Sequence, residues 1–583
     1  MKKAPLRLTT ALILALGISS VASAKSLFDN FYFFGDSLSD MGNNQAEHAP
    51  ITSGGSTWAN YFANKFDNSA TPSNNGGNDY AYAGALTGFV VAQFNNYLAS
   101  TGKRVDSNAL YSIWAGANDI NVGLQFGETP QEIIAIGTGN TNTIVEGLHN
   151  AGAKYIMVFN LPDLGRTPLG ESKGAYISGV LSQVSWAYNQ TLASALNADG
   201  FDVIQVDIYS LFNDLLDDPH HFGLANANDL FYTPTGADPN LDEHPTGAGH
   251  QMIADYAYSV IEGPTRAAIL AEAPFSVMDA QNFNIENQLF NVRSNMTKLA
   301  TAQTTFFASA SYSPYKQDSQ GTQGSGFDAH NTDFTAGIVH RINNNLIAGA
   351  AFAHSYGPVD LGKKIGGFDI AENITSLFGG YQYNKFYTDG IVNLGVINFN
   401  NFTRNIPIGP SQNLTHGETN GLQFGADLVT GYNLINRNNL QTGPLVNVDY
   451  QNIRVDAYAE KGSIGGIAEN FDSQNNNSLT TGFGWMFNYI MQVKNIQLMP
   501  FAQLTYNHQW ITAVRNVGAG LVSLPGSHFT IPVSAPNGDF GLANIGISTN
   551  LVKNVNLSLG YNTTLYKEGS RSQNISASIQ VSI

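Results

Sequence analysis

The second half of the chain alternates between apolar and small polar side chains. At the C-terminus, apolar residues stand at positions 575, 577, 579, 581 and 583, and the residues between them are Ser576, Ser578, Gln580 and Ser582. A period of two places these two sets on opposite faces of a β-strand. Segments of about ten residues with one apolar face and one polar face are typical of transmembrane β-strands.

A soluble β-sandwich is the alternative, because its strands alternate in the same way. Three features favour a membrane barrel: the strands continue to the last residue, the turns are alternately short and long, and the polar positions carry few charges. Only 12% of all residues are charged, and no later stretch is long and apolar enough for a transmembrane helix. Residues 301–583 accommodate about twelve strands of this length, so we expect a transmembrane β-barrel of about 12 strands.

The N-terminus has the pattern of a secretory signal. Lys2, Lys3 and Arg7 precede a short apolar run over residues 11–18, and Ala22-Ser23-Ala24 fits the small-x-small pattern of a cleavage site. We therefore predict a signal peptide over residues 1–24.

The composition narrows the possible functions. The chain has no cysteine, which excludes disulfides, thiolate catalysis and cysteine-ligated metals. Its formal net charge of −17 argues against nucleic acid as a partner.

Between the signal peptide and the alternating half, strand-like and helix-like segments follow one another. The predicted strands are 109–115, 155–159 and 203–206, and the predicted helices are 130–151, 175–198 and 249–261. This order indicates a three-layer α/β sandwich around a parallel sheet. We therefore divide the chain into this domain (residues 27–264), a partly helical linker (265–300) and the barrel (301–583).

The stretch from Phe31 to Asp40 organises the α/β domain. Four aromatic residues predict a buried strand, Gly35-Asp36-Ser37 predicts a sharp turn, and a helix could then begin with Ser39 or Asp40 near its cap. A serine at such a turn stands clear of the backbone, and neighbouring N–H groups suit a developing oxyanion. The alternative is an ordinary strand-to-helix turn with small polar residues.

Four blocks of the sequence resemble those of the GDSL (SGNH) hydrolases, in the order of that family. They are Gly35–Asp40, Asn78–Ala85, Gly116–Asp119 and His244–Thr246. The resemblance implies an SGNH-hydrolase-like fold, in which Ser37 is the nucleophile and His244 the general base. It also implies an oxyanion hole made by the N–H groups of Ser37 and Gly84 and by the side-chain amide of Asn118. Ala83 departs from the family, which often has a glycine there.

The residue that orients the general base does not follow the family spacing. That family places an aspartate three residues before the histidine, and here the position is Leu241. Asp242 is the nearest carboxylate, so we predict a Ser37–His244–Asp242 triad. Glu243, Asp238, a backbone carbonyl and a Ser-His dyad are the alternatives.

The alternating half resembles the translocator of autotransporters, in pattern rather than in motif. The final residue is Ile583, where outer-membrane barrels more often end in Phe or Trp. This resemblance implies an outer-membrane protein that passes its own N-terminal passenger to the cell surface, with membrane lipids and the barrel-assembly machinery as partners.

Together the two resemblances imply a surface-displayed serine carboxylester hydrolase. Its substrate would be an ester or lipid, including the lysophospholipid class, and the acyl-enzyme route needs no metal or organic cofactor. A surface adhesin on a hydrolase-like scaffold, without turnover, is the alternative. The change at Leu241 keeps that alternative open.

Overall fold

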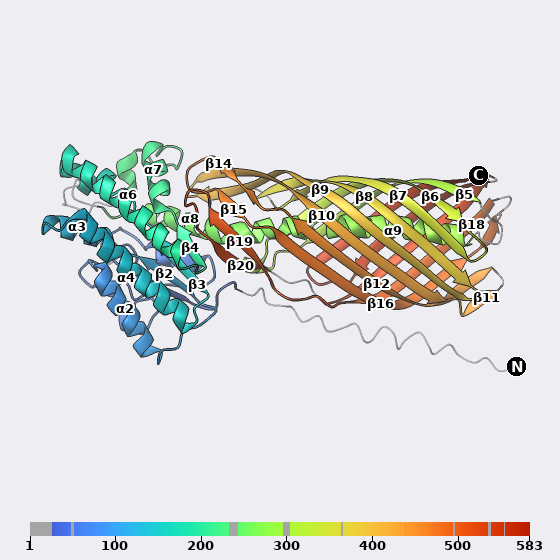
Figure 1. The fold of residues 1–583 in the computed structure, drawn as a ribbon, viewed down its shortest axis with the longest axis horizontal. Helices are drawn as coiled ribbons and strands as arrows, with labels where there is room; N and C mark the ends of the chain where they lie inside the picture. Colours follow the sequence, from blue (N-terminus) through green and yellow to red (C-terminus); the bar gives the residue numbers. More distant parts are fainter. Residues whose placement is uncertain are drawn as a thin grey trace.

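The computed structural model describes residues 26–47, 52–231, 243–294, 303–362, 365–437, 439–493, 496–533, 538–552 and 554–583. An N-terminal domain of helices and strands adjoins one end of a long barrel (Figure 1). The predicted signal peptide lies outside the described residues. Within the described ranges, no helix has the length and apolar character that crossing a bilayer requires.

The N-terminal domain is built on four parallel strands. They are β1 (Phe31–Gly35), β2 (Leu110–Trp114), β3 (Tyr155–Phe159) and β4 (Val203–Val206), and they lie side by side in this order. Nearly every residue of these strands is buried. Their largely apolar sequences fit a parallel sheet that is covered on both faces.

Helices cover both faces of this sheet. They are α1 (Trp58–Asn64), α2 (Thr87–Ser100), α3 (Ala117–Gln125), α4 (Pro130–Ala151), α5 (Pro168–Ser172), α6 (Ala175–Ala198), α7 (Ile208–Asp217) and α8 (Gly247–Ala267). One apolar core joins Trp58 of α1 and Ile253 of α8 to Phe31 and Phe33. A second core joins α2, α4 and α6 to the opposite face. The predicted three-layer α/β sandwich is therefore confirmed.

Local sequence explains where the helices begin. Thr129 and Glu132 form a capping box at the start of α4, where Pro130 occupies the first turn. The residues of α4 and α6 coincide with the two predicted helices.

The predicted helix start at Ser39 or Asp40 is wrong. Only a single turn forms there, in which the Asp36 carbonyl accepts from the N–H groups of Ser39 and Asp40. The Asp40 carboxylate then accepts from three successive N–H groups, those of residues 42, 43 and 44, at 2.7–3.0 Å. Because the Asp40 carboxylate binds these N–H groups, they do not continue into a helix from Ser39 or Asp40. The first helix among the described residues is α1, which begins at Trp58.

Within the described residues, twelve antiparallel strands form a closed ring, as predicted. They are β5 (Thr304–Gln317), β6 (Phe327–Arg341), β7 (Leu346–Asp360), β8 (Gly366–Tyr383), β9 (Phe386–Ile408), β10 (Ser411–Tyr432), β12 (Leu440–Val455), β16 (Gln474–Tyr489), β18 (Ile496–Gln509), β21 (Asp539–Val552), β22 (Val555–Leu565) and β23 (Ser570–Ser582). The last strand pairs with the first, and β10 pairs with β12. The barrel therefore has no open edge.

The helix α9 (Phe275–Ser294) runs through the inside of the barrel (Figure 1). Its polar side chains bind inward-facing residues of the strands. Asn284 donates to Ser311 at 3.0 Å, Gln281 donates to Ser376 at 3.0 Å, and Gln288 accepts from Gln580 at 2.7 Å. The part of the predicted linker that forms α9 thus lies in the lumen. The predicted division at residue 264 falls inside α8, and the domain boundaries stay predictions.

Outside the ring, a smaller sheet faces the N-terminal domain. Its strands are β13 (Tyr458–Ala459), β15 (Glu469–Phe471), β19 (Arg515–Leu521) and β20 (Phe529–Val533). Three short strands extend the barrel's own hairpins: β11 (Ile435–Arg437), β14 (Lys461–Gly462) and β17 (Met491–Val493). The small sheet contacts α8 and β4, so it joins the barrel to the N-terminal domain.

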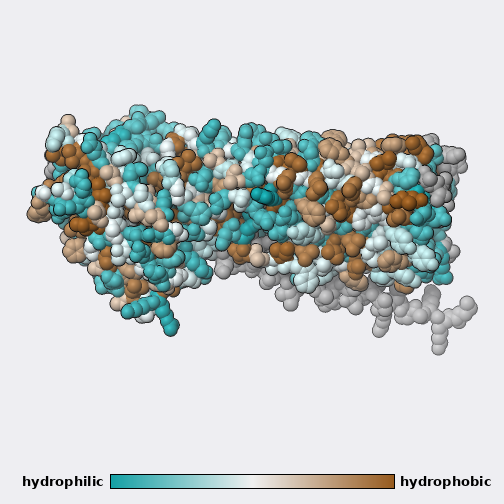
Figure 2. All heavy atoms as spheres, in the orientation of Figure 1, coloured by the Kyte–Doolittle hydropathy of each residue, from teal (hydrophilic) through white to brown (hydrophobic). Residues whose placement is uncertain are grey.

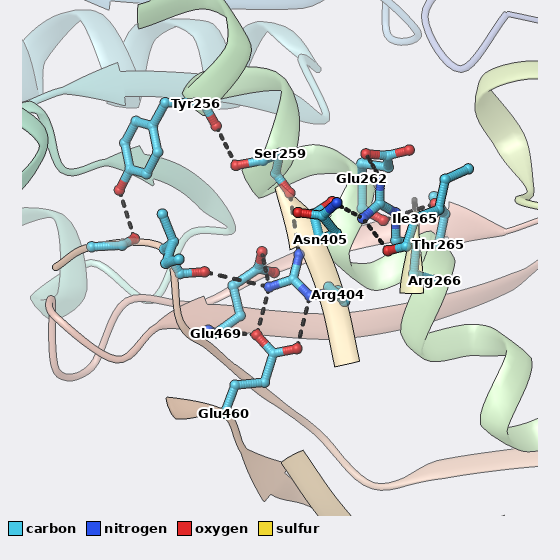
Figure 3. A network of polar contacts seen from close by, with 12 residues as sticks. Tyr256, Ser259, Glu262, Thr265, Arg266, Ile365, Arg404, Asn405, Glu460 and Glu469 are labelled. Atoms are coloured by element: carbon cyan, nitrogen blue, oxygen red, sulfur yellow. Dashed lines mark hydrogen bonds and ion pairs between the residues drawn. The ribbon is translucent and has the colours of Figure 1, made fainter. Parts of the chain in front are cut away.

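A buried arginine holds this junction together (Figure 3). Arg404 of β9 is 1% exposed and donates to both carboxylate oxygens of Glu460, at 2.7 and 2.6 Å. Its guanidinium also lies 3.0 Å from the Glu469 carboxylate and 3.5 Å from the carbonyl of Ser259 on α8. The Tyr256 hydroxyl donates to the Gly466 carbonyl at 2.8 Å. These contacts attach α8 to the barrel.

We predict that Ile579→Arg impairs assembly of the barrel more than Ser578→Arg does. Ile579 faces outward and is 43% exposed, and its neighbour Ala308 lies between the exposed aromatics Phe306 and Tyr312. A cation in the middle of the lipid-facing band costs about 2–4 kcal/mol. Ser578 faces inward, where its hydroxyl lies 2.6 Å from that of Ser558. The heat-modifiable band of the folded barrel measures assembly. Equal loss in both variants would contradict this orientation.

Candidate active site

Ser37 lies just beyond the carboxyl end of β1. The strand ends at Gly35, where a Cβ atom would lie 2.4 Å from the carbonyl oxygen of Trp114, so only glycine fits. Because β1 is an edge strand, the outer N–H and C=O groups of Gly35 need other partners. The Gln93 side chain accepts from this N–H at 3.0 Å and donates to this carbonyl at 2.8 Å. The N–H and the C=O group of Gly35 are therefore both held, which fixes the backbone before Ser37.

Asp36 and Asp40 shape the turn that carries Ser37. The Asp36 carboxylate accepts from the N–H of Leu38 at 3.1 Å, and burial raises the pKa of this carboxyl to about 7. Asp40 also accepts from the N–H of Ala83 at 2.8 Å, in the second sequence block. The nucleophile turn and the predicted oxyanion loop are thus tied together.

The structure brings His244 to Ser37. The ring nitrogen Nε2 of His244 lies 2.8 Å from Ser37 Oγ. His244 comes shortly before α8, whose first turn is capped by Thr246, which accepts from the N–H of Gly249 at 3.1 Å. A histidine that lacks its proton on Nε2 can take the hydroxyl proton at this distance.

A second histidine, His250 in the first turn of α8, has a different role. The Nδ1 atom of His250 accepts from the N–H of Trp58 at 3.2 Å, and burial lowers the pKa of this ring to about 3. His250 is thus a neutral hydrogen-bond acceptor in the core. A histidine near the start of a helix often has a structural role. Here His250, rather than His244, has that role.

The loop of Gly84, a predicted oxyanion donor, adjoins the Ser37 turn, because the Tyr82 N–H donates to the Gly35 carbonyl at 3.1 Å. Gly84 has a φ of 80°, a conformation that favours glycine. Among the described residues, the N–H groups of Ser37 and Gly84 have no hydrogen-bond acceptor. Asn118 donates one amide hydrogen to the carbonyl of Ala85 at 3.2 Å, which leaves a second amide hydrogen.

Two further contacts position Asn118. Gly116 precedes α3 with a φ of 124°, and a Cβ there would lie 2.5 Å from the Tyr188 hydroxyl. Asp119 accepts from the hydroxyl of Thr87 at 2.6 Å and from its N–H at 2.9 Å. The third sequence block is thus fixed to the start of α2, next to the Gly84 loop.

The predicted orienting residue lies outside the described part of the chain, as do Leu241 and Asp238. Glu243, one of the alternatives, is described, and its carboxylate accepts from the Asn121 side chain at 2.8 Å. Sequence reasoning did not single out Asn121 or Gln93, because each acts on a residue far away in the chain. The only feature of the sequence that could have pointed to Asn121 is its position shortly after the third sequence block.

Apolar side chains line a pocket beside Ser37 and His244. The other residues that line it are Asp36, Leu38, Trp114, Ala117, Asn118, Pro162, Leu164, Phe212, Glu243 and Pro245. Pro162 and Leu164 belong to the segment that follows β3. The polar atoms thus lie at one side of a largely apolar pocket, an arrangement that suits an ester with an apolar acyl group.

Comparisons with protein families match both halves of the chain. Residues 31–257 match the family model described as GDSL-like Lipase/Acylhydrolase, and residues 306–562 match the Autotransporter beta-domain. The chain joins a GDSL-type serine ester hydrolase to an autotransporter β-domain. It is thus an outer-membrane β-barrel protein with an exported passenger.

Relatives with both parts are found among curated proteins. Esterase EstA of Pseudomonas aeruginosa is 27% identical over 508 residues, which cover 83% of this chain and 76% of the relative. Lipase 1 of Photorhabdus luminescens is 23% identical over 594 residues, covering 85% of this chain and 87% of the relative. A Pseudomonas putida protein described as uncharacterized, from the trpE-trpG intergenic region, is 28% identical over 92% of this chain and 98% of its own length.

Among solved structures, the translocator domain of the autotransporter NalP from Neisseria meningitidis is similar to the barrel. It is 14% identical and covers 53% of this chain and 98% of its own length, with a TM-score of 0.41.

Proposed function

We propose that the passenger is displayed on the cell surface and cleaves carboxylic esters through a covalent acyl-enzyme on Ser37. The observation that carries this proposal is the 2.8 Å contact between Ser37 Oγ and His244 Nε2. The N–H groups of Ser37 and Gly84 and the side-chain amide of Asn118 are the oxyanion donors in this proposal, and hydrogen bonds tie their segments together. This set provides the nucleophile, the base and the oxyanion donors that acyl transfer needs. It favours turnover over a passenger that only binds.

In the acylation step, His244 Nε2 takes the proton of the Ser37 hydroxyl while Oγ attacks the ester carbonyl carbon. The carbonyl oxygen becomes an oxyanion and accepts from the N–H groups of Ser37 and Gly84 and from the Asn118 amide. Donors fixed before the reaction stabilise this charge most where water is excluded. Collapse of the intermediate breaks the bond to the alcohol, which leaves with the proton held by His244.

In the deacylation step, a water molecule attacks the acyl carbon of the Ser37 ester. His244 takes a proton from this water and returns a proton to Ser37 Oγ as the carboxylic acid leaves. The same oxyanion donors serve both steps, so no metal or organic cofactor enters this mechanism.

For His244 to accept at Nε2, its Nδ1–H must donate to a fixed group. We propose Asp242 for this role. A spacing of two residues would direct the side chain elsewhere in a regular strand or helix, but Pro239 and Pro245 favour an irregular loop around it. Asp238, Glu243 and a backbone carbonyl are the other candidates.

The substrates that we propose are esters of apolar acyl groups, lipids and lysophospholipids among them. The esterase and lipase names of the relatives and the apolar lining of the pocket support this class. A chain delivered by its own barrel would meet outer-membrane lipids and the barrel-assembly machinery on its way to the surface.

We predict that Ser37→Ala lowers the hydrolysis of p-nitrophenyl butyrate by a factor on the order of 10⁴ or more, because the nucleophile is lost. Ser39→Ala is the matched control. The Ser39 hydroxyl accepts from the Trp58 indole at 3.1 Å, so this change removes a hydroxyl of the same turn without touching His244. Steady-state rates of the purified full chain measure both. Activity retained by Ser37→Ala would disprove the assignment of the nucleophile.

We predict that Asp242→Asn lowers kcat by a factor on the order of 10²–10⁴, because the amide stabilises the wrong tautomer of His244. Asp238→Asn and Glu243→Gln are the controls, and each should leave most of the activity. An active Asp242→Asn variant beside an inactive Asp238→Asn variant would transfer the role to Asp238.

A further inference from the structure

Apolar side chains stand exposed around the Ser37 pocket. We name this set the apolar rim, and it consists of Tyr82, Phe89, Phe126, Ile136, Tyr176 and Ile177. Phe126 and Tyr176 are 78% and 81% exposed. Tyr82 lies in a loop, Phe126 directly follows α3, Phe89, Tyr176 and Ile177 lie in the first turns of their helices, and Ile136 lies in the second turn of α4. Single exposed apolar residues are common on proteins, but a group around one pocket calls for a function.

One side of the rim adjoins the apolar wall of the pocket. Tyr176 and Ile177 lie in the first turn of α6. The next residue, Ser178, donates its hydroxyl to the carbonyl of Gly165 at 2.8 Å. Leu164, directly before Gly165, lines the pocket. A partner surface in contact with Tyr176 and Ile177 would therefore also lie next to the pocket wall.

The other side of the rim adjoins the oxyanion donors. Phe89 lies in the first turn of α2, two residues after the Thr87 that binds Asp119. Ile136 lies one turn before Asn140, which donates to the Thr87 hydroxyl at 3.0 Å. Phe126 follows the last residue of α3, the helix that carries Asn118. The rim thus surrounds the catalytic residues from two sides.

The rim faces away from the barrel. The helix α3 lies at the end of the molecule opposite the barrel (Figure 1). The space-filling view shows apolar side chains gathered at the same end (Figure 2). The membrane that holds the barrel is therefore on the far side of the passenger from the rim.

We infer that the apolar rim docks the active site onto a phospholipid surface that approaches from outside the cell. This inference rests on the proposed ester hydrolysis. A ring that leaves the pocket open at its centre suits a lipid layer, which can supply ester to the pocket, whereas a protein partner would close it. Exposed charges of both signs, those of Glu128, Glu171 and Lys173, lie close to rim residues in the chain. Zwitterionic lipid therefore fits better than anionic lipid.

Binding can be measured without turnover. The full chain carrying Ser37→Ala is placed in nanodiscs and mixed with sucrose-loaded vesicles of phosphatidylcholine, which are then sedimented. We expect the nanodiscs to sediment with the vesicles. Adding Phe126→Ser and Tyr176→Ser should lower the partition coefficient about tenfold or more, because two large apolar side chains lose their contact with lipid. Phe89→Ser, on the other side of the rim, is a second variant in case the first one fails to fold, which its thermal unfolding midpoint shows.

Trp186→Ser is the matched control, because Trp186 is an exposed aromatic residue of α6 about 15 Å along the helix from Tyr176. Its partition coefficient should equal that of the parent chain. The inference is wrong if the parent does not bind, if the rim variants bind as well as the parent, or if the control loses as much binding. Cross-links between the rims of two chains, formed in detergent without vesicles, would assign the rim to a second copy of the chain. Failure of the wild-type chain to hydrolyse soluble p-nitrophenyl butyrate would count against the proposed function alone.

Discussion

The pairing of the last strand with the first determines much of this structure. When β23 pairs with β5, every strand of the ring has two neighbours, and the backbone can lie in lipid without unsatisfied N–H and C=O groups. A ring of twelve strands is wider than its own side chains can fill. The polar helix α9 occupies this space, and hydrogen bonds from its asparagine and glutamine residues hold it there. α8 begins three residues after His244, and α9 begins eight residues after α8 ends, so two successive helices connect the active site to the inside of the barrel.

The junction between the two parts depends on buried charge. Arg404 pairs with two buried carboxylates, those of Glu460 and Glu469, and a Cβ at Gly263 of α8 would lie 2.3 Å from the Glu469 carboxylate. Removing one member of such a buried group leaves its partner uncompensated, which typically costs about 3–5 kcal/mol. The junction therefore favours one arrangement of α8 on the barrel. Contacts from the passenger to the outer hairpins support it, such as the 2.8 Å contact between His221 and Asn413.

The sequence was most informative where a local pattern determines the structure. The apolar runs of β3 and β4, the capped helix α4 and the alternation of β23 could be read directly, because each depends on nearby residues. The irregular path after Ser37 could not, because it depends on how the Asp40 carboxylate distributes its hydrogen bonds. The small sheet of β13, β15, β19 and β20 was also missed, since its short strands pair over long stretches of chain.

In the candidate site, too, local patterns could be predicted from the sequence and long-range contacts could not. Motif order alone was enough to single out Ser37, Asn118 and His244, and the structure brings Ser37 and His244 within hydrogen-bonding distance. Their catalytic roles stay predictions, as does that of Asp242. The supporting contacts of Gln93 and Asn121 required the fold, because no spacing in the sequence relates them to the residues that they hold.

The central claim is that Ser37 is an activated nucleophile displayed outside the cell. Labelling of intact cells with a membrane-impermeant fluorophosphonate, followed by peptide mapping, tests both parts of this claim at once. The account predicts a single modified peptide that contains Ser37, labelled to the same extent before and after lysis. Labelling that requires lysis would contradict surface display, and modification of a different serine would contradict the active site described here.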